Sequence, residues 1–279
     1  MRDLAYSKIN LSLNVWAKQG DFHPIDSVVV SVDCCDTVRV SKRRDKTVVV
    51  KGCPGVAQEQ NSAYKAACEF VRVFGVGGCN VKIRKRIPVG AGMGGSSADA
   101  VSVVRCLCKL YGIDANCQKV RLLCSQLGSD NNFLLHGGLA RMTGKGDDLQ
   151  FGKLRKPLFF AVTTFSVSLL AKDVYNAFDA VGGNVRCDND RLMVLLQNGE
   201  DPSEQFGNNL QQSALSISNF AEPYLKFCSK NNLACHMTGS GSAFFVAFQN
   251  KKQAIRAKKT LCSAGFSTFV CKTAGKNLI

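Results

Sequence analysis

The chain contains a glycine-rich segment whose residue types suit the binding of phosphate groups. It reads Pro88-Val-Gly-Ala-Gly-Met-Gly-Gly-Ser-Ser-Ala-Asp-Ala100, and apolar residues at helical spacing follow it. Residues 80–87, directly before it, predict a strand. Glycines let the backbone approach a ligand, and the first amides of a helix carry partial positive charge. A strand, a glycine loop and a helix N-terminus in this order therefore indicate a site for a phosphate chain.

The residues of this segment leave more than one interpretation open. Gly90, Gly92 and Gly95 match the G-x-G-x-x-G spacing of dinucleotide-binding folds, and Asp114 lies roughly twenty residues further on. That aspartate follows a helix with no second strand between them, and the strand before the loop is charged rather than apolar. The Walker A pattern is absent, because no Lys-Ser or Lys-Thr follows the glycines. A simple tight turn would need fewer glycines, so the sequence favours a nucleotide-phosphate loop.

Two other side chains could act on a hydroxyl and on a phosphoryl group. Asp130 follows a predicted helix end at Gly128, and as a general base it could accept or orient the proton of an attacking hydroxyl. Lys8 could neutralise charge on a transferred phosphoryl group and keep Asp130 ionised. The ordinary alternatives are a turn or capping aspartate and an exposed strand lysine. Neither residue decides the function alone.

The histidines and cysteines give no pattern for a metal centre or a hydrolase. His23 lies in a short polar stretch between two predicted strands, and no histidine–carboxylate spacing or Gly-x-Ser-x-Gly elbow is present. The fourteen cysteines contain no C-x-x-C pair, and Cys106 and Cys108 would point to nearly opposite faces of one helix. We therefore expect reduced thiols in the core and no metal-ligating residues.

The composition is typical of a folded cytoplasmic enzyme. The chain has 279 residues, and its 46% hydrophobic content excludes a disordered protein. Neither a membrane-spanning apolar run nor the core of a signal peptide is present, and no Arg- and Ser-rich leader precedes the first strand. The net charge of +15 is spread over short clusters. This distribution favours a solvated face or a polyphosphate substrate over a stripe that binds a nucleic-acid duplex. We expect neither a nucleic acid nor a membrane as a partner.

The elements that must position these residues alternate between strands and helices. In the first strand, residues 8–15, apolar and polar side chains alternate, and the polar face could line a cleft. Further predictions for the first half are strands at 28–32, 37–41 and 47–50, a helix capped by Asn61, a helix after the glycine loop, and a helix through 120–127.

The second half begins with a new apolar strand at 158–164, after a polar stretch at Lys153–Pro157. It continues with helices, a polar loop at 198–203, a glycine segment at 238–242 beside a strand at 243–248, a helix through Ala254 and Leu261, and a strand at 268–271. Strands and helices alternate without a repeat, which predicts an α+β fold. We expect two domains, 1–155 and 156–279.

Three segments in order resemble the motifs of one kinase superfamily. They are Ser7-Lys-Ile-Asn-Leu11, the Pro88–Ala100 loop and Met237-Thr-Gly-Ser-Gly-Ser242. Together they resemble the GHMP superfamily of galactokinase, homoserine kinase, mevalonate kinase and phosphomevalonate kinase. Within it the chain is most similar to the kinases of 4-diphosphocytidyl-2-C-methyl-D-erythritol, through Lys8–Leu13, Asp21-Phe-His23 and Leu127–Asp130. The similarity spans essentially the whole chain.

The resemblance implies a fold and a reaction. The N-terminal half would be an ATP-binding domain like domain 2 of ribosomal protein S5, the C-terminal half would be ferredoxin-like, and the active site would lie between them. The reaction would be phosphorylation of a hydroxyl of diphosphocytidyl methylerythritol, with ATP and Mg²⁺ as cofactors. Asp130 would be the base and Lys8 its charged partner. We expect a monomer or weak homodimer.

The resemblance also implies binding residues. Those for the nucleotide would be Pro88, Gly90, Gly92, Met93, Gly94, Gly95, Ser96 and Ser97. Those for the substrate would be Asn10, Phe22, His23, Tyr175, Gly239 and Gly241, with His23 bonded to cytosine and Tyr175 stacked on it. The chain departs from the family pattern at Asp21-Phe22, usually Gly-Tyr, and at Asn131-Asn132, usually Val-Pro.

Two other functions remain as alternatives. A sister kinase would act on homoserine or mevalonate, which lack a nucleobase, so a requirement for cytidine separates the two. An RNA-binding protein of S5-like fold would show steeply salt-dependent RNA binding without ATP turnover. The aromatic residues do not interleave with the basic clusters, and RNA binding would leave the glycine loop without a role.

Overall fold

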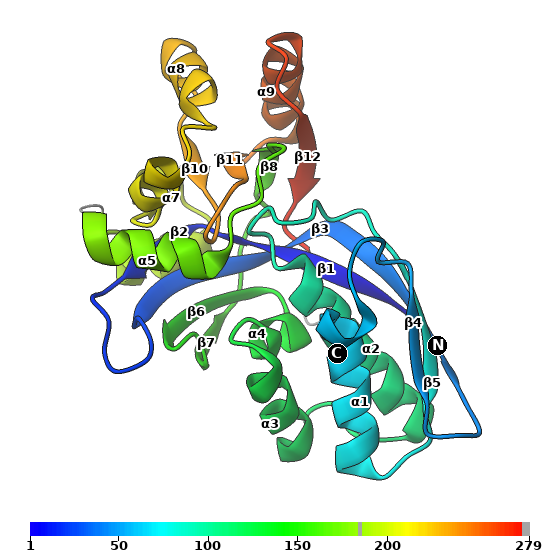
Figure 1. Cartoon of the computed structure of the whole chain (residues 1–279). Coiled ribbons are helices and arrows are strands. Elements are labelled where there is room, and N and C mark those ends of the chain that lie inside the picture. Colours follow the sequence, from blue (N-terminus) through cyan, green and yellow to red (C-terminus); the bar gives the residue numbers. More distant parts are fainter. Residues whose placement is uncertain (184–185, 275–279) are drawn as a thin grey trace.

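The computed structural model describes residues 1–183 and 186–274, and its strands form two β-sheets (Figure 1). The larger sheet contains β1 (Arg2–Asn10), β2 (Ser12–Val15), β3 (Ile25–Lys42), β4 (Val48–Lys51), β5 (Cys79–Arg84), β6 (Leu139–Gly144), β7 (Asp148–Gly152) and β9 (Gly207–Asn208). The smaller sheet has the order β10 (Cys235–Met237), β11 (Phe244–Phe248), β8 (Phe159–Thr163) and β12 (Thr268–Lys272).

The helices lie on both sheets. They are α1 (Ser62–Phe74), α2 (Gly95–Tyr111), α3 (Gln118–Leu127), α4 (Asn131–His136), α5 (Ala171–Val181), α6 (Asn189–Asn198), α7 (Gln211–Ile217), α8 (Glu222–Lys230) and α9 (Lys251–Ser263), with single 3-10 turns η1 (Gln58–Gln60) and η2 (Ser203–Gln205). As predicted, the Asn61 side chain caps α1 and accepts a hydrogen bond from the Ala63 amide at 2.9 Å. None of the helices in residues 1–183 and 186–274 is long and apolar enough to cross a bilayer.

Strand β3 corrects two of the predictions from sequence. The strands expected at 28–32 and 37–41 are parts of one strand of 18 residues. Its first part pairs with β6 and its second part with β5, while β1 runs antiparallel to it. The polar residues near the middle do not interrupt the strand because Asp36 is bonded by the Ile87 amide at 2.8 Å and by the Lys85 ammonium at 2.5 Å. These partners lie far away in the sequence and could not be foreseen from local propensity.

The predicted first strand is longer and is divided. Strand β1 already begins at Arg2, and a break at Leu11 separates it from β2. Both faces of the 8–15 segment are buried, so the polar face does not lie along a cleft over its whole length. Ser12 donates a hydrogen bond to the side chain of Asn189 on α6 at 2.5 Å. Of this segment, Lys8, Asn10 and the apolar Leu13 reach a cavity.

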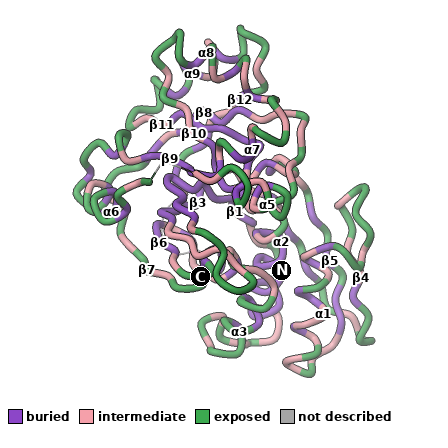
Figure 2. Tube along the Cα trace, turned by 60° about the vertical axis from the view of Figure 1, so that its left-hand side comes forward, coloured by how far each residue is buried: buried purple, intermediate pink, exposed green. Residues whose placement is uncertain are grey.

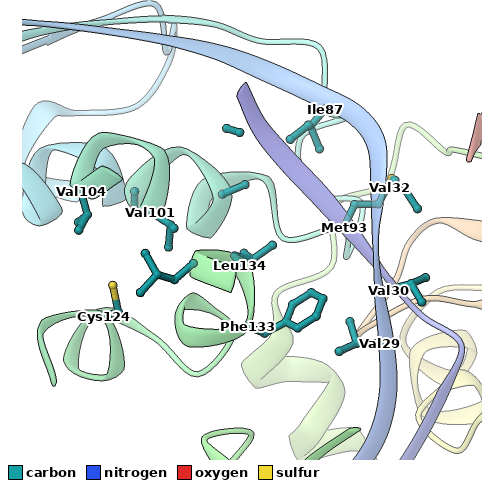
Figure 3. Close-up of a cluster of buried hydrophobic side chains, with 14 of the residues drawn as sticks. Val29, Val30, Val32, Ile87, Met93, Val101, Val104, Cys124, Phe133 and Leu134 are labelled. Carbon is teal, nitrogen blue, oxygen red and sulfur yellow. The ribbon is translucent and has the colours of Figure 1, made fainter. Parts of the chain in front are cut away.

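Two hydrophobic cores hold the molecule together, and β8 contributes to both. Phe160 and Val162 belong to the larger core, while Ala161 between them belongs to the smaller one, as expected when side chains alternate across a strand. The larger core lies between β3 and the helices α2, α3 and α4, which are drawn in close-up in Figure 3. Figure 2 shows that buried residues follow β3 and β8, whereas α3 and α9 are largely exposed.

The expected domain division at 155/156 falls just before β8. Elements of the second half nevertheless join the larger sheet: β9 pairs parallel with β2, and Thr273 forms an isolated bridge with Val32 of β3. The division into domains 1–155 and 156–279 therefore stays a prediction. In the described residues, strands from the two halves of the chain pair with each other.

Candidate active site

The glycine segment forms the loop between β5 and α2, and it places the first amides of a helix at the wall of a cavity. Gly92 and Gly94 have left-handed φ angles of +72° and +70°, which other residues rarely adopt. Gly94 is the N-cap of α2, so this position has no side chain to occupy the amides of residues 95–97. Ser96 is exposed in the first helical turn. The amides and the helix dipole together form a site suited to an anion.

A second glycine segment, which follows β10, packs against this loop backbone to backbone. A Cβ atom on Gly92 would lie 2.4 Å from the carbonyl oxygen of Thr238, and one on Gly239 would lie 2.7 Å from the carbonyl oxygen of Gly92. The Ala243 amide donates to the Ala91 carbonyl oxygen at 3.3 Å. Each glycine is therefore needed because the other segment leaves no room for a side chain.

Two buried asparagines hold the second glycine segment in place. The side chain of Asn208 donates to the carbonyl oxygens of Met237 and Gly239 at 2.9 and 2.8 Å. The backbone amide of Asn10 donates to the Thr238 hydroxyl oxygen at 2.9 Å. The segment is thus anchored to both β1 and β9, and it supports the phosphate loop from the opposite side.

The ammonium group of Lys8 lies between the glycine loop and the carboxylate of Asp130. Its Nζ is 3.5 Å from Asp130 Oδ2, and it donates a hydrogen bond to Asn10 Oδ1. A Cβ atom on Gly94 would lie 3.2 Å from Lys8 Cγ, and the Lys8 amide donates to the Met93 carbonyl oxygen at 3.0 Å. The lysine therefore packs directly under the loop, where a buried positive charge can stabilise a transferred phosphoryl group.

Asp130 lies in the short connection between α3 and α4. Gly128 ends α3, and Asp130 occupies the N-cap position of α4. Within the described part of the chain, its side chain forms no capping hydrogen bond to that helix. The carboxylate lines the cavity instead, with 30% of the side chain exposed. This geometry favours a role for Asp130 as a general base over a role as a helix-capping residue.

The cavity lining also includes a cluster of aromatic side chains and a histidine. His23 Nε2 lies 2.7 Å from Asp179 Oδ1, and the rings of His23 and Tyr175 are 5.0 Å apart at 43°. Burial raises the pKa of Tyr175 to about 12, and the nearby Asp130 carboxylate adds to the shift. Tyr175 is therefore a neutral hydroxyl at physiological pH. The Asp179 carboxylate orients the imidazole and leaves Nδ1 for another partner.

Sequence reasoning missed Asp179, although it lies four residues after Tyr175 and so on the same face of α5. It also missed a charge network under the phosphate loop. Lys85 Nζ donates to Asp36 Oδ2 at 2.5 Å and to Asp99 Oδ2 at 2.7 Å, and both carboxylates are buried. Burial raises the pKa of Asp99 to about 7, and the Asp36 charge adds to this while Lys85 opposes it. No local sequence pattern brings these three residues together.

This network predicts a pH dependence of stability. The pKa of Asp99 is about 7 in the folded protein and about 3.9 in an unfolded chain. Between these values the unfolded state binds fewer protons, so the contribution of Asp99 to stability falls as the pH rises and levels off above pH 7. We expect the Tm difference between wild type and Asp99→Asn to change through this window. Calorimetry from pH 4 to 8 measures it, with Asp114→Asn as the control. A difference independent of pH would contradict the assignment.

Most of the predicted site residues meet at one cavity of about 1090 Å³. The residues from the prediction that line it are Lys8, Asn10, Phe22, His23, Pro88, Gly90, Gly92, Met93, Gly94, Gly95, Ser96, Asp130, Tyr175 and Gly239. The side chain of Met93 points into the core (Figure 3), so its contribution to the cavity comes from the backbone. Within the described residues, Ser97 and Gly241 are not part of the lining. Gly241 instead packs behind Gly92.

The cysteines and the other side chains that could ligate a metal ion are distributed as follows. All fourteen cysteines are free thiols, and Cys106 and Cys108 are both buried because α2 packs on more than one side. Among residues 1–183 and 186–274, no group of three or more His, Cys, Asp or Glu side chains is arranged to hold a metal ion. An ion at this site would depend on hydroxyl and phosphate oxygens.

Known proteins match this chain in both halves. The GHMP kinases N-terminal domain matches residues 61–138, and the GHMP kinases C-terminal domain matches residues 192–267. A 4-diphosphocytidyl-2-C-methyl-D-erythritol kinase from Caldicellulosiruptor saccharolyticus is 30% identical, over 92% of this chain and 91% of its own length. The chain belongs to the GHMP kinases.

Solved structures share the fold of this GHMP kinase. A crystal structure of 4-(cytidine 5′-diphospho)-2C-methyl-D-erythritol kinase has a TM-score of 0.82 and 27% identity, and covers 99% of this chain and 100% of that one. A homoserine kinase from Cytophaga hutchinsonii has a TM-score of 0.72 and 16% identity, with 100% and 95% coverage, and shows the common fold. The predicted two-part α+β fold is confirmed. The chain is an ATP-dependent small-molecule kinase.

Proposed function

We propose that this GHMP kinase transfers the terminal phosphoryl group of ATP to a free hydroxyl of 4-diphosphocytidyl-2-C-methyl-D-erythritol, a step of the non-mevalonate route to isoprenoid precursors. The relative from Caldicellulosiruptor saccharolyticus and one of the solved structures described above are named for this substrate. One observation carries most of the argument. The Lys8–Asp130 pair lines the same cavity as the glycine loop and the His23–Tyr175 cluster.

The arrangement suits phosphoryl transfer because little covalent work is required of the protein. The glycine loop would hold the triphosphate, and Lys8 would neutralise charge on the transferred group. Asp130 would accept or orient the proton of the substrate hydroxyl, with Asn10 fixing the lysine between them. The His23–Tyr175 cluster would bind the cytosine and so place the hydroxyl in line with the terminal phosphate.

We also propose Mg²⁺ as a cofactor. Mg²⁺ prefers oxygen ligands and usually retains waters while binding substrate phosphates. The exposed hydroxyl of Ser96 at the start of α2 lines the cavity and fits such a ligand set. When bound, the ion would supply charge neutralisation between the phosphates of ATP. The other proposed properties are a cytoplasmic location, a monomer or weak homodimer, and no nucleic-acid partner.

A substrate panel tests the proposed function directly. Purified protein is incubated with ATP, Mg²⁺ and one alcohol at a time, and ADP release is followed. We expect turnover with diphosphocytidyl methylerythritol and not with homoserine, mevalonate or methylerythritol phosphate. Faster turnover of homoserine or mevalonate would transfer the assignment to a sister kinase.

His23 gives a narrower prediction about the substrate. His23→Ala should raise the KM for the cytidine substrate about tenfold or more, because one hydrogen bond in a partly buried site is lost. The KM for ATP should remain within about twofold, since the imidazole is bonded to Asp179 and packed near Tyr175 rather than on the glycine loop. Steady-state kinetics with each substrate varied in turn measures both constants. His136→Ala, at a histidine packed on Phe151 outside the cavity lining, is the control. An equal loss of affinity for both substrates would contradict the role.

A further inference from the structure

The direction of the Asp130 carboxylate depends on the backbone of the turn between α3 and α4. The carboxylate pairs with Lys8 at 3.5 Å, which is longer than a charge-assisted hydrogen bond and does not fix its direction. Within residues 1–183 and 186–274, the side chain also forms no capping bond to α4. Whatever holds the turn in place therefore decides where this carboxylate points.

Asn131, the next residue, folds back onto the end of α3. Its backbone amide donates to the Gly128 carbonyl oxygen at 3.2 Å, and its side-chain Nδ2 donates to the Cys124 carbonyl oxygen at 3.2 Å. Cys124 belongs to the last turn of α3, where carbonyl groups lack partners within the helix. Asn131 is 1% exposed, and a Cβ atom on Gly128 would lie 3.4 Å from its Nδ2. These contacts close the turn and leave Ser129 and Asp130 at the cavity.

Asn132 makes a second contact between the two helices, which lie side by side in Figure 1. Its Nδ2 donates to the Ser125 hydroxyl oxygen at 2.6 Å, and that hydroxyl donates to the Arg121 carbonyl oxygen at 3.1 Å. Two neighbouring amide side chains thus bond the first turn of α4 to the last turns of α3. Asp130 directly precedes both, so these bonds set the position of its backbone.

Both amide groups also carry a cost in stability. Within the described parts of the chain, Oδ1 of Asn131 and Oδ1 of Asn132 are buried without a hydrogen-bond partner. A buried polar atom without a partner destabilises the folded state. The usual pattern of the similar kinases at these two positions, Val-Pro, contains no such atoms. The cost is explained if the Nδ2 groups are needed for what they hold in place.

We propose that Asn131 and Asn132 are positioning residues, which hold the α3–α4 turn so that the Asp130 carboxylate faces the Lys8 ammonium and the substrate hydroxyl. This inference rests on the proposed role of Asp130 as the base. Asn131 is the main contact, because it is buried and bonds to the backbone, whereas Asn132 is partly exposed and bonds to a side chain. A displacement of about 1 Å in a reacting group can cost around 10² in rate.

A double-mutant cycle with Asp130 tests this role. Asn131→Val should lower kcat about tenfold and leave the KM for ATP within about twofold, because the displaced group is the base and not the glycine loop. In an Asp130→Asn background, the same substitution should leave the residual kcat within about twofold, since no base remains to be positioned. The Tm should change by only a few degrees, because the valine removes one hydrogen bond together with one unsatisfied oxygen. Steady-state kinetics and thermal unfolding of the four proteins measure these quantities.

A second set of variants tests the contact made by Asn132. Asn132→Ala and Ser125→Ala remove the same hydrogen bond from its two ends. Each should lower kcat about threefold, and the double variant should lose no more than either single variant. Asn116→Ala is the matched control, because Asn116 is an exposed asparagine in the connection after α2, outside the cavity lining of the described chain. Its kcat should equal that of wild type.

The outcomes separate this inference from the proposed function. If Asp130→Asn keeps wild-type turnover, the role of Asp130 as the base fails and the positioning role fails with it. If Asp130→Asn lowers kcat and Asn131→Val does not, only the positioning role is wrong. An equal loss of kcat from Asn131→Val in both backgrounds would also overturn the inference, because the asparagine would then act on the fold and not through Asp130.

Discussion

Asp130→Asn should lower kcat by roughly 10²–10⁴-fold, the range expected when a general base is removed. The asparagine has almost the same shape, but it cannot accept the hydroxyl proton. It also removes the negative charge 3.5 Å from the Lys8 ammonium. The dissociation constant for ATP should change little, because the phosphates would be held by the glycine loop and not by this side chain. Rapid-quench or steady-state assays with saturating substrates measure the chemical loss, and equilibrium binding of an ATP analogue measures the affinity.

The matched control for this prediction is Asp114→Asn. Asp114 is also an aspartate in a short connection after a helix, where its side chain accepts a hydrogen bond from the Asn116 amide at 2.9 Å. It is not part of the cavity lining in the described chain, so its substitution should affect stability slightly and turnover hardly at all. Wild-type turnover in a correctly folded Asp130→Asn variant would remove the assigned role.

Gly92→Ala should reduce kcat/KM for ATP by about 100-fold or more and lower the Tm. The new Cβ would lie 2.4 Å from the Thr238 carbonyl oxygen and 2.8 Å from that of Gly241, which is closer than atoms can approach. The two glycine segments must therefore separate, and a shift of about 1 Å in positioned groups can cost around 10² in rate. The left-handed φ of +72° adds backbone strain.

Gly112→Ala separates the effect of the steric clash from the effect of backbone strain. Gly112 has a similar φ of +67°, but a Cβ there would meet no described atom within 4 Å. Its substitution should show only the cost of the left-handed conformation, about 1–2 kcal/mol, without loss of kcat/KM. Thermal unfolding and ATP kinetics on both variants make the comparison. Similar behaviour of the two variants would mean that close packing against Thr238 is unimportant.

Local features of the fold could be predicted from the sequence because their causes are local. Asn61 as a helix cap and the start of α2 after the glycines depend on neighbouring residues, and the structure confirms both. The length of β3 could not be predicted, since its polar middle is stabilised by Lys85 and the backbone before Pro88. The α4 helix after Asp130 and the β6–β7 hairpin were also missed, because both are short and the expected patterns need longer segments.

The same distinction between local causes and contacts of distant segments applies to the site. The glycine loop, Lys8, Asp130 and His23 were found from residue types and motif resemblance, and the structure places them on one cavity. Asp179, Lys85 and Asp99 were not found, because their importance depends on contacts between distant segments.

The packing of the second glycine segment, residues 238–242, against the phosphate loop has a consequence for the synthesis of the protein. The Ala91 carbonyl oxygen of the phosphate loop accepts a hydrogen bond from the Ala243 amide, which lies in the last quarter of the chain. During synthesis, the ribosome therefore releases the phosphate loop long before the segment that supports it. A nascent or truncated chain lacks the segment that packs against the loop, so we expect it to bind ATP weakly.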